Sequence, residues 1–201
     1  PAPRGQNAIP LKGFETVQPI YQFIKYLLKN EKELEIDSDH MMVISPDEGG
    51  MRRAVFYSNQ LGVDMGMFFK RRNYSTLVNG EHPVISMEFL GNDVSGKDVI
   101  IVDDMIASGK TVLEVAKELK KRNAAHVIIC ATFGLFNDGL EELDQAYKEK
   151  VFDHIYTTNL CSCPSALKER PYYHNVDLSR YIALINDTLN HDTSVNEIMN
   201  A

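Results

Sequence analysis

The sequence has little that would suit a membrane, a polyanion or an oxidising compartment. Its 201 residues contain no apolar run long enough to span a bilayer. Basic residues are outnumbered by acidic ones, 21 to 28, and the net charge of −7 argues against nonspecific binding to nucleic acid. The three cysteines do not make a disulfide framework. We therefore expect a cytoplasmic protein that binds neither a membrane nor a nucleic acid.

A recognisable transition-metal motif is also lacking. Cys161 and Cys163 are separated by one residue, but no second pair of ligands follows at a suitable spacing. The histidines show no metal-binding spacing either. His154 lies at an expected strand and is interpreted as a structural or surface residue, and His174 lies near the last expected helix.

The most informative segment is residues 99–111, Val-Ile-Ile-Val-Asp-Asp-Met-Ile-Ala-Ser-Gly-Lys-Thr. Four β-branched aliphatic residues end in Asp103 and Asp104, and a short polar loop then leads into an amphipathic stretch. This order predicts a buried parallel strand, a loop at its carboxyl end and a helix N-terminus, which together form an anion site. The two acids need a polyol or a metal as their partner. Phosphate and hydroxyls on one small ligand indicate a sugar phosphate.

Two alternatives for this segment remain. Residues 108–111, Ser-Gly-Lys-Thr, look like the end of a P-loop. The earlier glycine of such a loop would fall at Asp104, so the nucleotide-cradling loop is absent. The simpler alternative is that Asp103 and Asp104 only cap a helix, although capping needs one acid and the sequence supplies two.

This pattern resembles the ribose-phosphate motif of the phosphoribosyltransferase fold. The resemblance assigns Asp103 and Asp104 to the ribose 2- and 3-hydroxyls. It assigns the 5-phosphate to the loop residues Ala107, Ser108, Gly109, Lys110 and Thr111. Many members of the family have an acid where Ala107 stands, and its absence weakens the case for a transferase that exchanges a nucleobase.

A second segment resembles the pyrophosphate loop of ribose-phosphate diphosphokinases, the enzymes that make phosphoribosyl pyrophosphate. Residues 43–54 read Val-Ile-Ser-Pro-Asp-Glu-Gly-Gly-Met-Arg-Arg-Ala. Asp47 matches the acid that helps to hold Mg²⁺, whereas Glu48 replaces the family's usual histidine. Gly49 and Gly50 let the backbone approach phosphate closely. By chemistry alone, the segment is also compatible with an ordinary turn.

A third segment is the basic run Lys70-Arg71-Arg72. In the same enzymes a Lys-Arg-Arg run begins a loop over the active site. Lys70 and Arg72 match the residues that neutralise charge on the phosphoryl group during transfer. Residues 73–82 are polar and turn-rich, and we expect a flexible loop there. A solvated basic loop is the alternative; the position between two phosphate motifs favours the functional interpretation.

Alternating strand and helix patterns predict an α/β fold with a central, mostly parallel sheet flanked by helices, as in type I phosphoribosyltransferases. The expected helices cover residues 17–29, 51–61, 109–122 and 178–189. The expected strands cover residues 41–45, 65–69, 85–90, 99–102, 127–132 and 152–157. The family subunit has two similar halves. By resemblance, we divide this chain into a stub and linking helix from a missing N-terminal half, a phosphoribosyltransferase-like domain and a tail, at residues 1–38, 39–190 and 191–201.

The resemblance implies a ribose-phosphate diphosphokinase that transfers pyrophosphate from ATP to ribose 5-phosphate, with Mg²⁺ as cofactor. The products would be phosphoribosyl pyrophosphate and AMP, and the enzyme would be a homo-oligomer. We expect the chain alone to be inactive, because the adenine site belongs to the missing half and a neighbouring subunit. The alternatives are a nucleobase phosphoribosyltransferase and a noncatalytic homologue that regulates the synthetase. The latter would usually lose an active-site residue, whereas Lys70, Arg72, Asp103 and Asp104 are all present.

Overall fold

The computed structural model describes residues 19–32, 34–72 and 84–195. The strands, in chain order, are β1 (Met41–Ser45), β2 (Asp64–Arg72), β3 (Val84–Leu90), β4 (Asp98–Ile106), β5 (Val127–Gly134), β6 (His154–Thr158) and β7 (Tyr173–Val176). The α-helices are α1 (Ile20–Asn30), α2 (Met51–Leu61), α3 (Lys110–Lys121), α4 (Glu141–Lys148) and α5 (Ser179–Asn190). Two short 3₁₀ helices are η2 (Glu48–Gly50) and η3 (Ser165–Glu169). The expected loop at residues 73–82 lies outside the described residues.

The strands form one sheet of seven, in the order β3-β2-β1-β4-β5-β6-β7. All neighbouring pairs are parallel except β2 and β3, which are antiparallel. The strand order reverses between β1 and β4, because the chain runs outward from β1 to β3 and then returns to the other side of β1. Ligands of open α/β sheets bind at such a switch point, outside the carboxyl ends of the strands. The fold class predicted from the sequence is confirmed.

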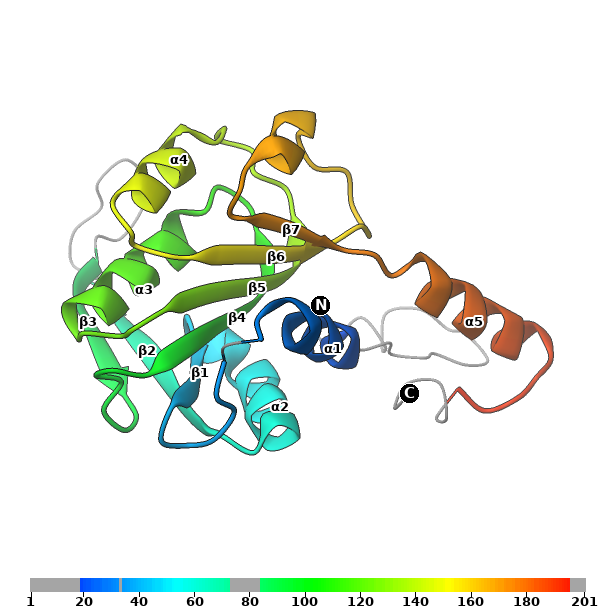
Figure 1. Ribbon diagram of the computed structural model, residues 1–201, viewed down its shortest axis with the longest axis horizontal. Coiled ribbons are helices and arrows are strands. Elements are labelled where there is room, and N and C mark those ends of the chain that lie inside the picture. The colour runs from blue at the N-terminus through cyan, green and yellow to red at the C-terminus, as the bar shows by residue number, and fades with distance from the viewer. Residues whose placement is uncertain (1–18, 33, 73–83, 196–201) are drawn as a thin grey trace.

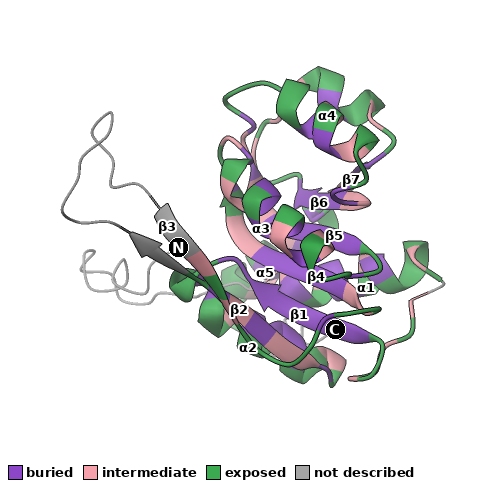
Figure 2. Ribbon diagram, turned by 90° about the vertical axis from the view of Figure 1, so that its left-hand side faces the viewer, coloured by how far each residue is buried: buried purple, intermediate pink, exposed green. Residues whose placement is uncertain are grey.

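Helices cover both faces of the sheet (Figure 1). Helices α3 and α4 pack on the face that receives Val99 and Ile101 of β4. Helices α1 and α2 pack on the opposite face, which receives Ile100 and Val102. Side chains on a strand alternate between faces, so a continuous aliphatic run supplies two cores at once. Figure 2 shows the result as buried central strands between more exposed helices.

Helix α5 extends from the sheet at the end of the described chain (Figure 1). Its buried residues Tyr181 and Ile185 pack with Val195 in a small cluster separate from the two cores. Among the described residues, no helix combines the length and the apolar character that a bilayer crossing requires.

Most expected elements are present, and the differences have physical reasons. Strands β2 and β4 are longer than predicted, because pairing continues past their aliphatic residues; Asp103 pairs with Ala131, and Met105 with Phe133. Helix α4 and strand β7 were not predicted from the sequence. Helix α4 has only eight residues. Strand β7 has four, Tyr-His-Asn-Val, at the edge of the sheet.

Candidate active site

The turn after β1 lies at the carboxyl edge of the sheet, beside the switch point. Asp47 caps the 3₁₀ helix η2, because its Oδ1 accepts a hydrogen bond from the N–H of Gly50 at 3.0 Å. The hydroxyl of Ser45 donates to the carbonyl of Asp47 at 2.7 Å. A Cβ on Gly50 would lie 2.6 Å from Ser45 Oγ, so this turn has no room for a side chain there. Helix α2 follows immediately, and its first N–H groups lie beside this turn.

Asp103 and Asp104 lie on β4, next to β1. Each carboxylate accepts a hydrogen bond from the following N–H group: Asp103 Oδ1 from Asp104 at 2.8 Å, and Asp104 Oδ1 from Met105 at 2.9 Å. Asp103 is the more buried, with 16% of its side chain exposed against 40% for Asp104. Burial raises the pKa of Asp103 to about 7, and the charge of Asp104 acts in the same direction.

Arg53 of α2 reaches these acids, and the sequence analysis gave it no role. Its Nη1 lies 3.6 Å from Asp103 Oδ1, and its Nη2 lies 3.6 Å from Asp104 Oδ2. The Arg53 Nη1 atom is buried, yet it has no hydrogen-bond partner among the described residues. A buried donor without an acceptor is costly, which is typical of a site that awaits a ligand. The signal was present in the sequence, since this arginine follows the glycine turn by three residues.

The loop after β4 has the geometry of an anion site. Gly109 caps helix α3 with φ +92°, a conformation that glycine adopts without strain. The first turn of α3 contains no acidic residue, so the partial positive charge of the helix end is not neutralised there. Ser108 Oγ accepts a hydrogen bond from the N–H of Lys110 at 3.4 Å. The Lys110 ammonium pairs with Asp138 at 3.1 Å.

Lys70 and Arg72 lie on the last residues of β2. Strand β2 runs parallel to β1, and Met67 is the partner of Ser45, the last residue of β1. Lys70 and Arg72 therefore lie at the same carboxyl edge of the sheet as the turn that contains Asp47. Their backbone pairs with Met87 and Val84 of β3, and the register shifts between Arg71 and Arg72.

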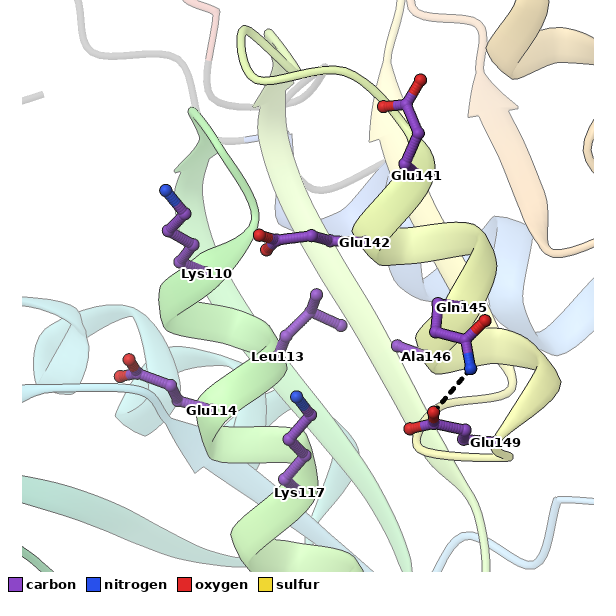
Figure 3. Close-up of a pocket in the computed structure, with 9 residues that line it drawn as sticks. All are labelled: Lys110, Leu113, Glu114, Lys117, Glu141, Glu142, Gln145, Ala146 and Glu149. Atoms are coloured by element: carbon purple, nitrogen blue, oxygen red, sulfur yellow. Dashed lines mark hydrogen bonds between the residues drawn. The ribbon is translucent and has the colours of Figure 1, made fainter.

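A separate groove lies between α3 and α4 (Figure 3). Its lining residues include Lys110 but neither Asp103 nor Asp104. Most of its lining side chains are charged or polar, and Gln145 donates to Glu149 at 2.6 Å across one turn of α4. The groove is therefore separate from the paired acids at the switch point.

Comparison with known proteins agrees with this geometry. Residues 13–166 match the sequence profile of the family described as the phosphoribosyl transferase domain. This chain belongs to that family.

Within the phosphoribosyl transferase family, the chain is similar to curated relatives named ribose-phosphate pyrophosphokinase. The chain is 33% identical over 143 residues to a ribose-phosphate pyrophosphokinase of Ureaplasma parvum, with 71% of this chain and 40% of the relative covered. It is 38% identical over 124 residues to the enzyme of the same name from Thermococcus kodakarensis, with 61% and 40% covered. The chain thus spans less than half the length of these relatives.

A solved structure supports the same fold. The phosphoribosylpyrophosphate synthetase of Mycobacterium smegmatis superposes with a TM-score of 0.68 at 24% sequence identity. The match covers 87% of this chain and 51% of that one. At this identity the likeness establishes the fold, which is the type I phosphoribosyltransferase sheet predicted from the sequence.

Proposed function

We propose that this chain carries the ribose 5-phosphate site of a ribose-phosphate pyrophosphokinase. The observation behind the proposal is that two adjacent carboxylates and an unneutralised helix N-terminus follow one another along β4 and its loop. Carboxylates suit the hydroxyls of a sugar, and the helix end suits its phosphate. The names of the curated relatives support the same assignment.

In this proposal, Asp103 and Asp104 accept hydrogen bonds from the ribose 2- and 3-hydroxyls. The backbone from Ala107 to Thr111 binds the 5-phosphate. With both ends of the sugar held, its 1-hydroxyl is oriented to attack the β-phosphorus of ATP, and AMP is the leaving group. The narrow turn at Gly49 and Gly50 and the adjoining α2 N-terminus would receive the transferred pyrophosphate.

Lys70 and Arg72 would act on the phosphoryl group during transfer. Negative charge is redistributed over the phosphate oxygens in the transition state, and a fixed cation there lowers the barrier. The support for this role is their place on β2, at the same sheet edge as Asp47 and the paired acids. Glu48 lies in the same turn as Asp47, and we assign it no role in transfer.

The residues also fit Mg²⁺, which prefers oxygen ligands. Asp47, Asp103 and Asp104 are carboxylates near the carboxyl ends of neighbouring strands. Each accepts one backbone hydrogen bond through its Oδ1 atom. Asp47 would hold the ion, with the phosphates as further ligands. When bound, Mg²⁺ would neutralise phosphate charge in the site.

We further propose that residues 39–190 form one half of a longer subunit, joined to the other half through residues 1–38. The short coverage of the relatives supports this division. The adenine site would then lie in the other half and in a neighbouring subunit, so the active protein would be a homo-oligomer. Residues 191–201 would form a tail.

This division predicts binding without synthesis. The isolated 201-residue chain should bind ribose 5-phosphate in calorimetry but release little or no AMP from ATP in a coupled assay. Robust synthesis by this chain alone would contradict the two-half arrangement while leaving the sugar site intact. Absence of ribose 5-phosphate binding would contradict the sugar site itself. Consumption of phosphoribosyl pyrophosphate and a free base, without AMP formation from ATP, would favour a nucleobase phosphoribosyltransferase.

A second prediction concerns Arg53. Arg53→Met keeps the length of the side chain but removes the cation that favours ionisation of Asp103. The pKa of Asp103 should rise further, so fewer sites hold an ionised acid near pH 7. We expect ribose 5-phosphate affinity to fall roughly tenfold near pH 7 and to recover partly as pH is raised.

Calorimetry across a pH series would measure this effect. Arg52→Met is the matched control, because Arg52 precedes Arg53 on the same helix and is exposed. Equal affinities for the parent and Arg53→Met at every pH would show that Arg53 does not tune the acids.

A further inference from the structure

Three side chains that are distant in sequence meet on the sheet face covered by α1. Glu31 follows the last residue of α1, His154 begins β6, and His174 lies on β7. Ligand atoms of all three lie within 4.8 Å of one another. They come from three elements, which is why no spacing in the sequence revealed them.

The distances within this Glu31–His154–His174 cluster approach those of a metal site. His174 Nε2 lies 2.9 Å from His154 Nδ1, and Glu31 Oε1 lies 3.7 Å from His154 Nε2. Ligands at 2.0–2.1 Å from a tetrahedral zinc ion stand about 3.3 Å from each other. The two observed contacts use different nitrogens of His154, of which an ion would take one, and the 2.9 Å contact is a hydrogen bond that the ion would replace. With one ligand atom from each residue, the three atoms lie within 4.8 Å of one another. The Glu31–His154 contact is too long for a hydrogen bond.

The surroundings of the cluster would orient its ligands. The hydroxyl of Tyr156 donates a hydrogen bond to Glu31 Oε1. The ring of Tyr156 stacks on His174, with centroids 4.5 Å apart and planes 16° from parallel. Such outer contacts fix the direction of a ligand's lone pairs and raise metal affinity. Tyr156 is itself buried between the core and the cluster.

The cluster is accessible and chemically suited to a transition metal. The side chains of Glu31 and His154 are 19% and 32% exposed, so an ion can reach them. Two imidazoles and one carboxylate match zinc rather than magnesium, which prefers oxygen ligands.

We propose that Glu31, His154 and His174 bind one zinc-type divalent cation, with a fourth position open to water. The ion would join the end of α1 to β6 and β7, and so fix the segment that precedes the domain against its sheet. His154 is the first residue of β6. The cluster therefore lies toward the opposite end of the sheet from Asp103 and Asp104, and its role would be structural rather than part of pyrophosphate transfer.

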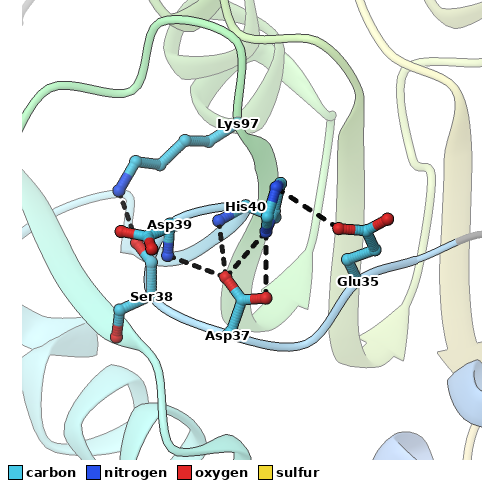
Figure 4. Close-up of polar contacts among 6 residues, drawn as sticks. All are labelled: Glu35, Asp37, Ser38, Asp39, His40 and Lys97. Atoms are coloured by element: carbon cyan, nitrogen blue, oxygen red, sulfur yellow. Dashed lines mark hydrogen bonds and ion pairs between the residues drawn. The ribbon is translucent and has the colours of Figure 1, made fainter.

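A second group, Glu35, Asp37 and His40, also has its ligand atoms within 4.8 Å of one another, but its contacts indicate an ion-paired turn (Figure 4). His40 Nδ1 lies 2.8 Å from Asp37 Oδ1, and His40 Nε2 lies 3.3 Å from Glu35. Hydrogen bonding to Asp37 raises the pKa of His40, which favours the protonated ring that cannot bind a metal. All three residues are exposed.

The test is titration of the chelator-treated 201-residue chain with zinc chloride in a calorimeter. Cys161→Ser and Cys163→Ser provide the background, because thiols bind zinc on their own. We expect one zinc per chain and no comparable binding of magnesium. Cobalt(II) should give the intense visible absorption of a tetrahedral site. His154→Ala or His174→Ala should weaken zinc binding by more than about 100-fold, beyond the usual effect of an outer contact.

Matched variants make the assignment specific. Glu31→Gln keeps an acceptor for Tyr156 but removes the charge, and should also weaken binding. Tyr156→Phe, which removes only an outer contact, should cost about 10- to 100-fold. His40→Ala should bind zinc as the parent does. Circular dichroism would verify that each variant is folded. Absence of zinc binding, binding kept by both His154→Ala and His174→Ala, or binding abolished by His40→Ala would overturn the proposal.

Discussion

Replacing Lys70 or Arg72 with alanine in the full-length protein is expected to lower turnover by roughly 10²–10³. A cation at the transferring phosphoryl group interacts more strongly with the transition state than with bound ATP. Its loss should therefore reduce kcat much more than it changes substrate affinity. Steady-state assays of AMP release, with both substrates varied, would separate the two quantities.

Arg71→Ala is the matched control for this experiment. It removes the same charge from the intervening residue of β2, and we expect a far smaller effect on turnover. Three equal losses would mean that only the net positive charge of the segment matters. Preserved turnover with weakened affinity in Lys70→Ala and Arg72→Ala would show that the segment is a surface clamp.

The sequence predicted those parts of the fold that follow from continuous hydrophobic patterns. The aliphatic runs of β1, β4 and β5 are buried on both faces, and such runs are characteristic of central parallel strands. The amphipathic helix after Gly109 was predicted to within one residue at each end. The edge strand β3 was also recognised from alternation, which is the pattern of a half-covered strand.

Other parts of the fold and of the candidate sites depend on contacts between segments that are distant in the sequence, and they were not predicted. Strand β7 contains His174 and Asn175, and it becomes a strand because it pairs with β6. Arg53 received no role from the sequence, because only the fold places α2 beside β4. His154 and His174 are 20 residues apart in the chain, so their contact appears only when β6 and β7 pair.

The candidate site was predicted unevenly for the same reason. The motif that contains Asp103, Asp104 and Gly109 is continuous, so its strand, loop and helix could be interpreted together. The turn at Asp47 was recognised from a separate motif, and the sheet order brings it next to the first. The electrostatic state of the acids could not be predicted, because it depends on burial of Asp103 and on Arg53.

Because Asp103 is buried, removing its charge should weaken sugar binding and at the same time stabilise the fold. In Asp103→Asn, one hydroxyl loses a charge-assisted hydrogen bond, which costs about 1.5–3 kcal/mol, or roughly 10- to 150-fold in ribose 5-phosphate affinity. Asp104→Asn should weaken binding by a similar factor. Calorimetry on the 201-residue chain would measure both. If both variants bind as tightly as the parent, the acids are only caps and the proposed sugar site is wrong.

Stability should change in the other direction for Asp103→Asn. The pKa of Asp103 is raised from 3.8 to about 7 in the folded chain, so the folded state retains a proton that the unfolded state has lost. The parent therefore loses stability as pH rises between these values, and the full cost remains above pH 7. Asparagine carries no charge and removes this cost, although Arg53 loses an ion-pair partner. We expect the free energy of unfolding of Asp103→Asn to exceed that of the parent by on the order of 1–3 kcal/mol at about pH 8. Urea unfolding at about pH 5 and pH 8 would measure it. Asp104 is more exposed, so Asp104→Asn should gain less stability. A loss of stability in Asp103→Asn that does not depend on pH would instead show that the Asp103 carboxylate supports the fold.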